Sequence, residues 1–165
     1  MNVQEAARFD DFLLRVGKLN YAWTNTESLL IHLIAGLSRT DNETATVIFL
    51  TLNTTRARVD LVQRLAKMER AGADERGQVL DVTGAILGLA GLRNRYNHCI
   101  YAFDPESGNT RSILMRIADR KETIKMGQAF ELDAAAIDEI DKAIAQLHRI
   151  NHQVWSIVHT FGYPS

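Results

Sequence analysis

The residues of this sequence best suited to chemistry form one short polar run at the end of a long apolar segment, Arg93-Asn94-Arg95-Tyr96-Asn97-His98. If the segment is a helix, residues four apart share a face, so Arg93 lies beside Asn97 and Asn94 beside His98. The partial negative charge at a helix C-terminus favours a protonated imidazole and a nearby guanidinium. The run therefore predicts a site suited to a phosphate group.

This run resembles the signature motif of the HEPN superfamily, an arginine followed directly by a polar residue, with a histidine a few positions on. The match is Arg93, Asn94 and His98, with four residues between the arginine and the histidine. The resemblance implies a helical domain, a homodimer whose two motifs face each other, and metal-independent endoribonuclease activity of toxin or defence type. It also implies that Arg93 stabilises charge on the phosphate, that His98 acts as acid or base, and that Asn94 orients one of them. RNA is then the substrate, and an antitoxin protein is a candidate partner.

Three supporting residues are predicted around the motif. Asn97 shares a helix face with Arg93. In one toxin subgroup a tyrosine follows the histidine by two positions, whereas this chain has Ile100 there and Tyr101 one residue further on, so it departs from that subgroup's pattern. Glu27 lies on an apolar stripe, where a buried carboxylate needs a partner. That partner is either an arginine from a neighbouring helix or the Arg93 cluster, which Glu27 would then orient.

A competing site is a stripe of three histidines near the end of the chain, His148, His152 and His159, alongside Trp155 and Asp141. Two histidines four residues apart can bind a metal, and a nearby carboxylate can add to the site. The chain lacks a zinc spacing that involves cysteine, and histidines beside a buried seam often serve only in packing. We therefore expect neither a metal site nor a cofactor.

Cys99 is the only cysteine and lies in an apolar run that predicts a buried strand, which disfavours a role as nucleophile. Three functional hypotheses remain open. They are a dimeric ribonuclease, a non-catalytic helical module that dimerises or binds RNA or a partner, and a metal-binding helical bundle.

The composition is that of one globular domain, residues 1–165, with 46% hydrophobic and 24% charged residues. The net charge of −1 argues against a generally basic surface, but basic residues outnumber acidic ones from Arg56 to Arg76 and from Arg111 to Lys125. We expect RNA to approach this middle part of the chain. A single cysteine, no secretory signal and no long apolar run predict a cytoplasmic protein without a membrane span.

The pattern of apolar residues predicts a mainly α fold, an antiparallel bundle of about five helices with a small β-hairpin or meander between the last two. The stripe Phe9, Leu13, Val16 and Trp23 belongs to the first helix. The expected helices are Glu5–Ser38, Glu43–Leu52, Arg56–Ala71, Glu75–Asn97 and one that Asp133 caps. The expected strands are Cys99–Phe103, Ser112–Ala118 and Glu122–Ala129, with turns at 105–109 and 119–121.

Three glycines interrupt the fourth predicted helix, Gly84, Gly88 and Gly91. Glycine costs roughly 1 kcal/mol relative to alanine inside a helix, so their presence needs an explanation. Gly84 and Gly88 share a face, where the absence of side chains lets another backbone approach. Close packing in the core and a contact between two copies of the chain are the two interpretations.

Overall fold

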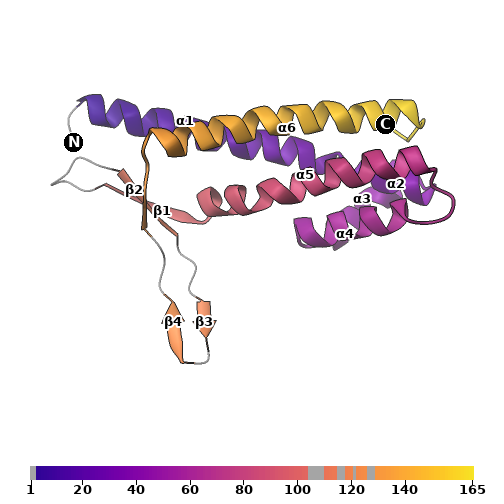
Figure 1. Ribbon diagram of the computed structural model, residues 1–165, viewed down its shortest axis with the longest axis horizontal. Coiled ribbons are helices and arrows are strands. Elements are labelled where there is room, and N and C mark those ends of the chain that lie inside the picture. Colours follow the sequence, from indigo (N-terminus) through magenta and orange to yellow (C-terminus); the bar gives the residue numbers. More distant parts are fainter. Residues whose placement is uncertain (1–2, 104–109, 115–117, 121, 126–128) are drawn as a thin grey trace. The chain divides into compact units, whose positions relative to one another are not determined.

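The computed structural model describes residues 3–103, 110–114, 118–120, 122–125 and 129–165 (Figure 1). In these ranges the helices are α1 (Val3–Ser28), α2 (Leu30–Ser38), α3 (Asn42–Thr51), α4 (Thr55–Ala66), α5 (Ala73–Asn97) and α6 (Ala134–Thr160). Between α5 and α6 the described residues form five short strands. The mainly α fold with a β insertion before the last helix is thus confirmed.

The chain divides into two compact units. The first, here called the sheet unit, comprises Met1–Tyr21 and Gly91–Ile144. The second, here called the helical unit, comprises Ala22–Ala90 and Ala145–Ser165. Each of the long helices α1, α5 and α6 contributes one segment to each unit.

The helical unit is built around apolar side chains of several helices, with α2, α3 and α4 close together (Figure 1). Its largest fully buried side chains are Trp23, Leu30, Leu33, Ile34, Ile86, Leu147, Ile150, Ile157, Val59 and Val62. Thr26 is buried among them and donates its hydroxyl to the carbonyl of Ala22 at 2.8 Å. A buried hydroxyl is therefore satisfied within its own helix.

The expected caps are present at three helix starts. Asp41 accepts from the amide of Thr44 at 2.7 Å, Thr54 from Ala57 at 3.1 Å and Asp133 from Ala136 at 2.9 Å. Side-chain acceptors at these positions satisfy amides that have no partner inside the helix. Sequence signals of this local kind therefore fixed where α3, α4 and α6 begin.

Two predicted helix boundaries were wrong. The expected first helix is interrupted at Leu29, whose amide bonds the carbonyl of Thr26, three residues before it, at 3.2 Å. Helix α4 ends at Ala66 rather than Ala71, because the amides of Lys67 and Met68 bond the carbonyls three residues before them. Such tighter turns terminate a helix.

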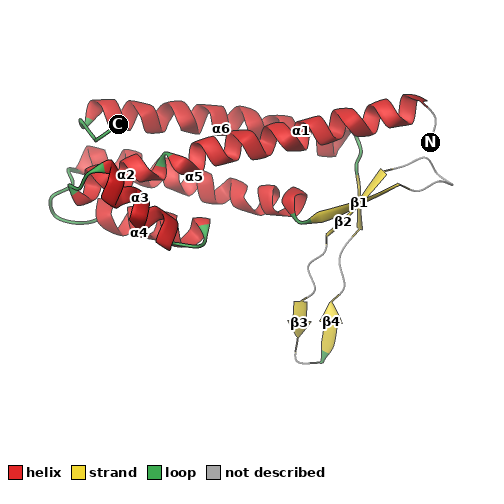
Figure 2. Ribbon diagram, turned by 180° about the vertical axis from the view of Figure 1, so that it is seen from behind, coloured by secondary structure: helices red, strands yellow, loops and turns green. Residues whose placement is uncertain are grey.

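The strands form two antiparallel sheets (Figure 2). Strands β1 (Cys99–Phe103), β2 (Thr110–Leu114) and β5 (Ala129–Glu131) pair in that order, with Cys99 opposite Leu114. Strands β3 (Ala118–Arg120) and β4 (Thr123–Lys125) form a separate pair. The prediction of two or three strands was therefore too low.

The predicted turn at 119–121 was also wrong for its first two residues, because Asp119 and Arg120 are strand residues paired with Ile124 and Thr123. The segment consists of polar residues of types that are common in turns, so its sequence resembles a turn although the backbone of Asp119 and Arg120 pairs as a strand. The predicted turn at 105–109 lies outside the described residues.

An aromatic cluster forms the core of the sheet unit. The ring of Phe12 meets Tyr96 at a centroid distance of 6.0 Å and Tyr101 at 5.4 Å, both edge to face. Phe12 is buried and Leu13 is 39% exposed, so the prediction of Leu13 as a core residue was wrong, whereas Val16 and Trp23 of the predicted stripe are buried.

Within the described ranges, none of the helices combines the length and the hydropathy of a membrane span.

Candidate functional site

The candidate motif stands where α5 ends and β1 begins. Asn97 is the last residue of α5, and the amide of His98 still bonds the carbonyl of Asn94 at 3.2 Å. Cys99 opens β1, half-buried, and its thiol donates to the carbonyl of Arg95. The predicted change from helix to strand at this point is confirmed.

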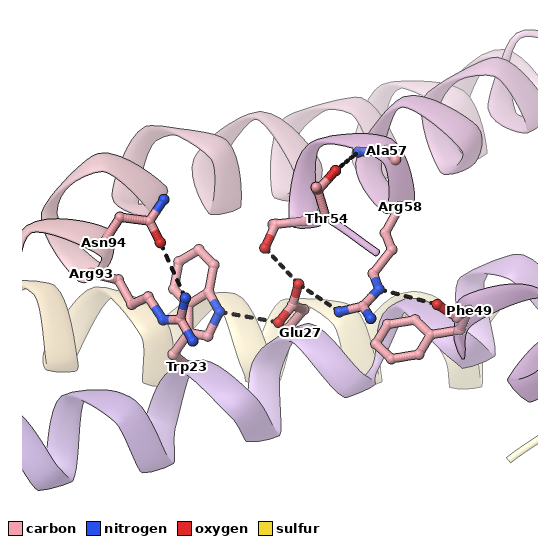
Figure 3. Close-up of polar contacts among 9 residues, drawn as sticks. Trp23, Glu27, Phe49, Thr54, Ala57, Arg58, Arg93 and Asn94 are labelled. Atoms are coloured by element: carbon pink, nitrogen blue, oxygen red, sulfur yellow. Dashed lines mark hydrogen bonds and ion pairs between the residues drawn. The ribbon is translucent and has the colours of Figure 1, made fainter. Parts of the chain in front are cut away.

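Arg93 and Asn94 are joined directly. Nη1 of Arg93 donates to Oδ1 of Asn94 at 3.1 Å, and both side chains are half-buried (Figure 3). Asn97 and His98 are exposed. The motif thus offers an accessible imidazole and, close in sequence, a guanidinium whose orientation an amide fixes.

Glu139 of α6 anchors the end of α5 from within the sheet unit. Its Oε2 accepts from Nη1 of Arg95 at 3.1 Å and from the hydroxyl of Tyr96 at 3.3 Å. Tyr101 adds a further link, because its hydroxyl donates to the carbonyl of Tyr96 at 2.6 Å. These contacts hold the backbone that carries Asn97 and His98, and Tyr101 reaches the motif only through the main chain of Tyr96.

Sequence reasoning did not find Glu139, because it lies 43 residues after Tyr96. The only signal was its place in an acidic segment of the last helix, and that segment contains several carboxylates. A contact of this kind depends on how two helices pack, which no local pattern specifies.

The free energy of unfolding at alkaline pH should depend on the buried Tyr96 hydroxyl beside Glu139. Burial, and after it the carboxylate of Glu139, raise the pKa of Tyr96 from 10.0 to about 12. Above pH 10 the unfolded chain loses this proton while the folded chain keeps it, so the free energy of unfolding should fall from about pH 10 to about pH 12. Denaturant unfolding across that range should show a shallower fall for Tyr96→Phe, and an identical slope would contradict the assignment.

Glu27 is held by three donors of the helical unit (Figure 3). Its carboxylate accepts from Nε1 of Trp23 at 3.1 Å, the hydroxyl of Thr55 at 2.6 Å and Nη1 of Arg58 at 3.1 Å. Arg58 in turn donates through Nε to the carbonyl of Phe49 at 3.1 Å and lies over its ring at 3.9 Å. The interpretation that an arginine from a neighbouring helix pairs with Glu27 is confirmed.

Among the histidines of α6, His159 makes an aromatic contact. His159 stacks on Trp155 at 5.9 Å, and Trp155 also meets His32 at 5.1 Å, whereas His148 and His152 are exposed. Asp141, the carboxylate considered beside them, forms an ion pair with Nε of Arg15 at 3.1 Å. No group of three or more side chains that could hold a metal occurs among the described residues.

Comparison with known proteins gives no relative: no family model, no curated protein and no solved structure matches this chain.

Proposed function

We propose that this chain is a HEPN-like RNA-binding protein and a metal-independent endoribonuclease. The observation that supports this best is the pair of groups at the end of α5, an exposed His98 and an Arg93 oriented by Asn94. An imidazole changes its protonation near neutral pH, which suits proton transfer, and a guanidinium suits phosphate oxygens. RNA supplies its own nucleophile, the ribose 2′-hydroxyl.

The proposed reaction is an internal transesterification. The 2′-oxygen loses its proton and attacks the adjacent phosphorus, and the bond from phosphorus to the 5′-oxygen breaks as that oxygen gains a proton. His98 takes the first proton or gives the second. Arg93 stabilises the negative charge that develops on the phosphate oxygens. The products are a 2′,3′-cyclic phosphate and a 5′-hydroxyl.

A homodimer is part of this proposal. One imidazole cannot act as base and acid in the same step, whereas two copies of the motif supply two imidazoles. Gly84, Gly88 and Gly91 on α5 are exposed, and a Cβ added at any of them would meet no atom within 4 Å. Core packing as their explanation was therefore wrong, and we assign this glycine face to contact between two α5 helices.

The combined replacement of Gly84, Gly88 and Gly91 by alanine should stabilise the single chain and weaken the dimer. Each alanine favours the helix by roughly 1 kcal/mol, with open space for its methyl group. Denaturant unfolding of dilute protein measures the gain, and analytical ultracentrifugation measures dimer dissociation. Gly17→Ala on α1, also in open space, is the control that should stabilise without weakening the dimer. An unchanged dissociation constant in the triple variant would remove this face from the dimer.

Incubation of the purified protein with single-stranded RNA in EDTA tests the activity. We expect cleavage that persists without divalent metal and yields 2′,3′-cyclic phosphate ends. Binding of RNA without cleavage would instead support the non-catalytic module. We place the activity in the cytoplasm, where a lone cysteine stays reduced, and we assign an antitoxin protein as the partner that restrains it.

A further inference from the structure

A second site lies in the helical unit, away from the motif in the sequence. A cavity of about 460 Å³ opens where the last residues of α2 and the residues after α6 meet the loop before α5. This volume is within the range of small-molecule pockets. Apolar side chains form part of its wall, among them Leu37, Ala71 and Phe161.

The wall of this cavity is fixed by the segment that follows α6. The ring of Tyr163 lies directly against Gly36, where an added Cβ would come within 2.1 Å of it. The Tyr163 hydroxyl donates to Oε1 of Glu75 at 2.5 Å, and Nδ1 of His32 bonds the carbonyl of Pro164 at 2.8 Å. The cavity is therefore formed before any ligand arrives, which lowers the entropic cost of binding.

Two helices, α2 and α6, end at the cavity, and each is followed by a residue in the left-handed conformation. This residue is arginine after α2 and glycine after α6. After α6, Gly162 has φ +64°, and the amide of Tyr163 returns to the carbonyl of Val158. After α2, Arg39 has φ 57°, and the amide of Thr40 returns to the carbonyl of Ala35. Glycine is the usual residue in this left-handed position, because a Cβ is unfavourable there. Arginine at such a site points to a use for its side chain.

The electrostatics of the cavity favour an anion. Arg39 and Arg70 are both exposed and line it, and neither guanidinium is paired with a carboxylate in the described ranges. The carboxylate of Glu75 also lines it, but its two oxygens accept from the Tyr163 hydroxyl and from the amide of Gly72. Arg39 and Arg70 contribute two positive charges to the lining and Glu75 one negative charge, so the net charge of the lining is +1. Within the described ranges neither arginine has a carboxylate partner.

We infer that this cavity binds a mononucleotide, with the phosphate on Arg39 and Arg70 and the base against Phe161. The guanidinium group of arginine donates parallel hydrogen bonds to the oxygens of a phosphate monoester, and an aromatic ring offers a stacking surface for a base. Inorganic phosphate alone would leave most of the cavity and its apolar wall unused. The inference is independent of the ribonuclease proposal, because every residue that it uses belongs to the helical unit.

Isothermal titration calorimetry of the full chain with AMP tests this inference. We expect AMP to bind, and both adenosine and inorganic phosphate to bind at least ten-fold more weakly. Arg39→Gly and Arg70→Ala should each weaken AMP binding at least ten-fold. Arg39→Gly should keep or raise the melting temperature, because glycine suits the left-handed position, so its loss of affinity cannot come from unfolding.

Arg64→Ala is the matched control, since Arg64 is an exposed arginine in the last turn of α4 and does not line the cavity. It should bind AMP as the wild type does, and so should His98→Ala, which separates this site from the ribonuclease proposal. No AMP binding by the wild type, or unchanged binding by both arginine variants, would overturn the inference. Tighter binding of a 5′-phosphorylated trinucleotide than of AMP would also overturn it, in favour of an RNA end.

Discussion

His98→Ala should lower the rate of RNA cleavage by at least about 100-fold and leave the fold intact, because general acid–base catalysis contributes roughly 10²- to 10⁴-fold. The side chain is exposed at the end of α5, so its removal leaves no cavity. The amide of His98 keeps its bond to Asn94 in the variant, because that bond belongs to the backbone. Cleavage rates under single-turnover conditions, with circular dichroism melting, provide the two measurements.

Two further variants separate chemistry from structure. Arg93→Lys keeps the positive charge but loses the planar fork, so we expect cleavage to fall while RNA binding persists. His152→Ala removes another exposed histidine, on α6, and should cleave as the wild type does. If His98→Ala retains full activity while all three variants stay folded, the proposed role of the motif is wrong and a contaminating nuclease becomes the first explanation.

The helical part of the fold could be predicted because its signals are local. Caps such as Asp41, Thr54 and Asp133 act within three residues, and the apolar stripe of a helix repeats within two turns. The interruption at Leu29 was not visible, because it consists of one tighter backbone turn, from the amide of Leu29 to the carbonyl of Thr26, which no side-chain pattern marks.

The position of the β insertion in the sequence was predicted correctly, but the number of its strands was not. Strand β1 was found with its bounds, because its apolar run is continuous. Strand β3 fell mostly in the predicted turn at 119–121, and only the first residue of β5 lay in a predicted strand, since strands of three residues are too short to show alternation. Their pairing depends on antiparallel hydrogen bonds between backbone groups, which carry no side-chain pattern.

The residues of the candidate motif could be predicted from the sequence, but the contacts that hold them in place could not. Arg93, Asn94 and His98 are close in sequence, so helix geometry alone brings them to one end of α5. Glu139 and the two arginines of the cavity, Arg39 and Arg70, depend on the packing of separate elements. The left-handed conformation of Arg39 contradicts residue preference, and no sequence rule would have placed an arginine there.

Glu27→Ala should destabilise the protein by about 3 kcal/mol, because it leaves a half-buried guanidinium without its carboxylate. The side chains of Glu27 and Arg58 are only 13% and 18% exposed, so water replaces the lost contact poorly. The indole of Trp23 and the hydroxyl of Thr55 lose an acceptor in the same change. Urea unfolding measures the loss, and the double variant Glu27→Ala, Arg58→Ala should lose less than the sum of the two single variants.

The matched control is the ion pair between Asp138 and Lys142 on α6, whose side chains are 60% and 75% exposed. Asp138→Ala should produce no measurable change in the urea midpoint, because exposed pairs contribute little. A Glu27→Ala protein as stable as the wild type would show that water or another donor replaces the carboxylate. RNA cleavage by the variant, measured where it is still folded, then separates the structural role from the orienting role: we expect wild-type rates, because the carboxylate serves Arg58, Thr55 and Trp23.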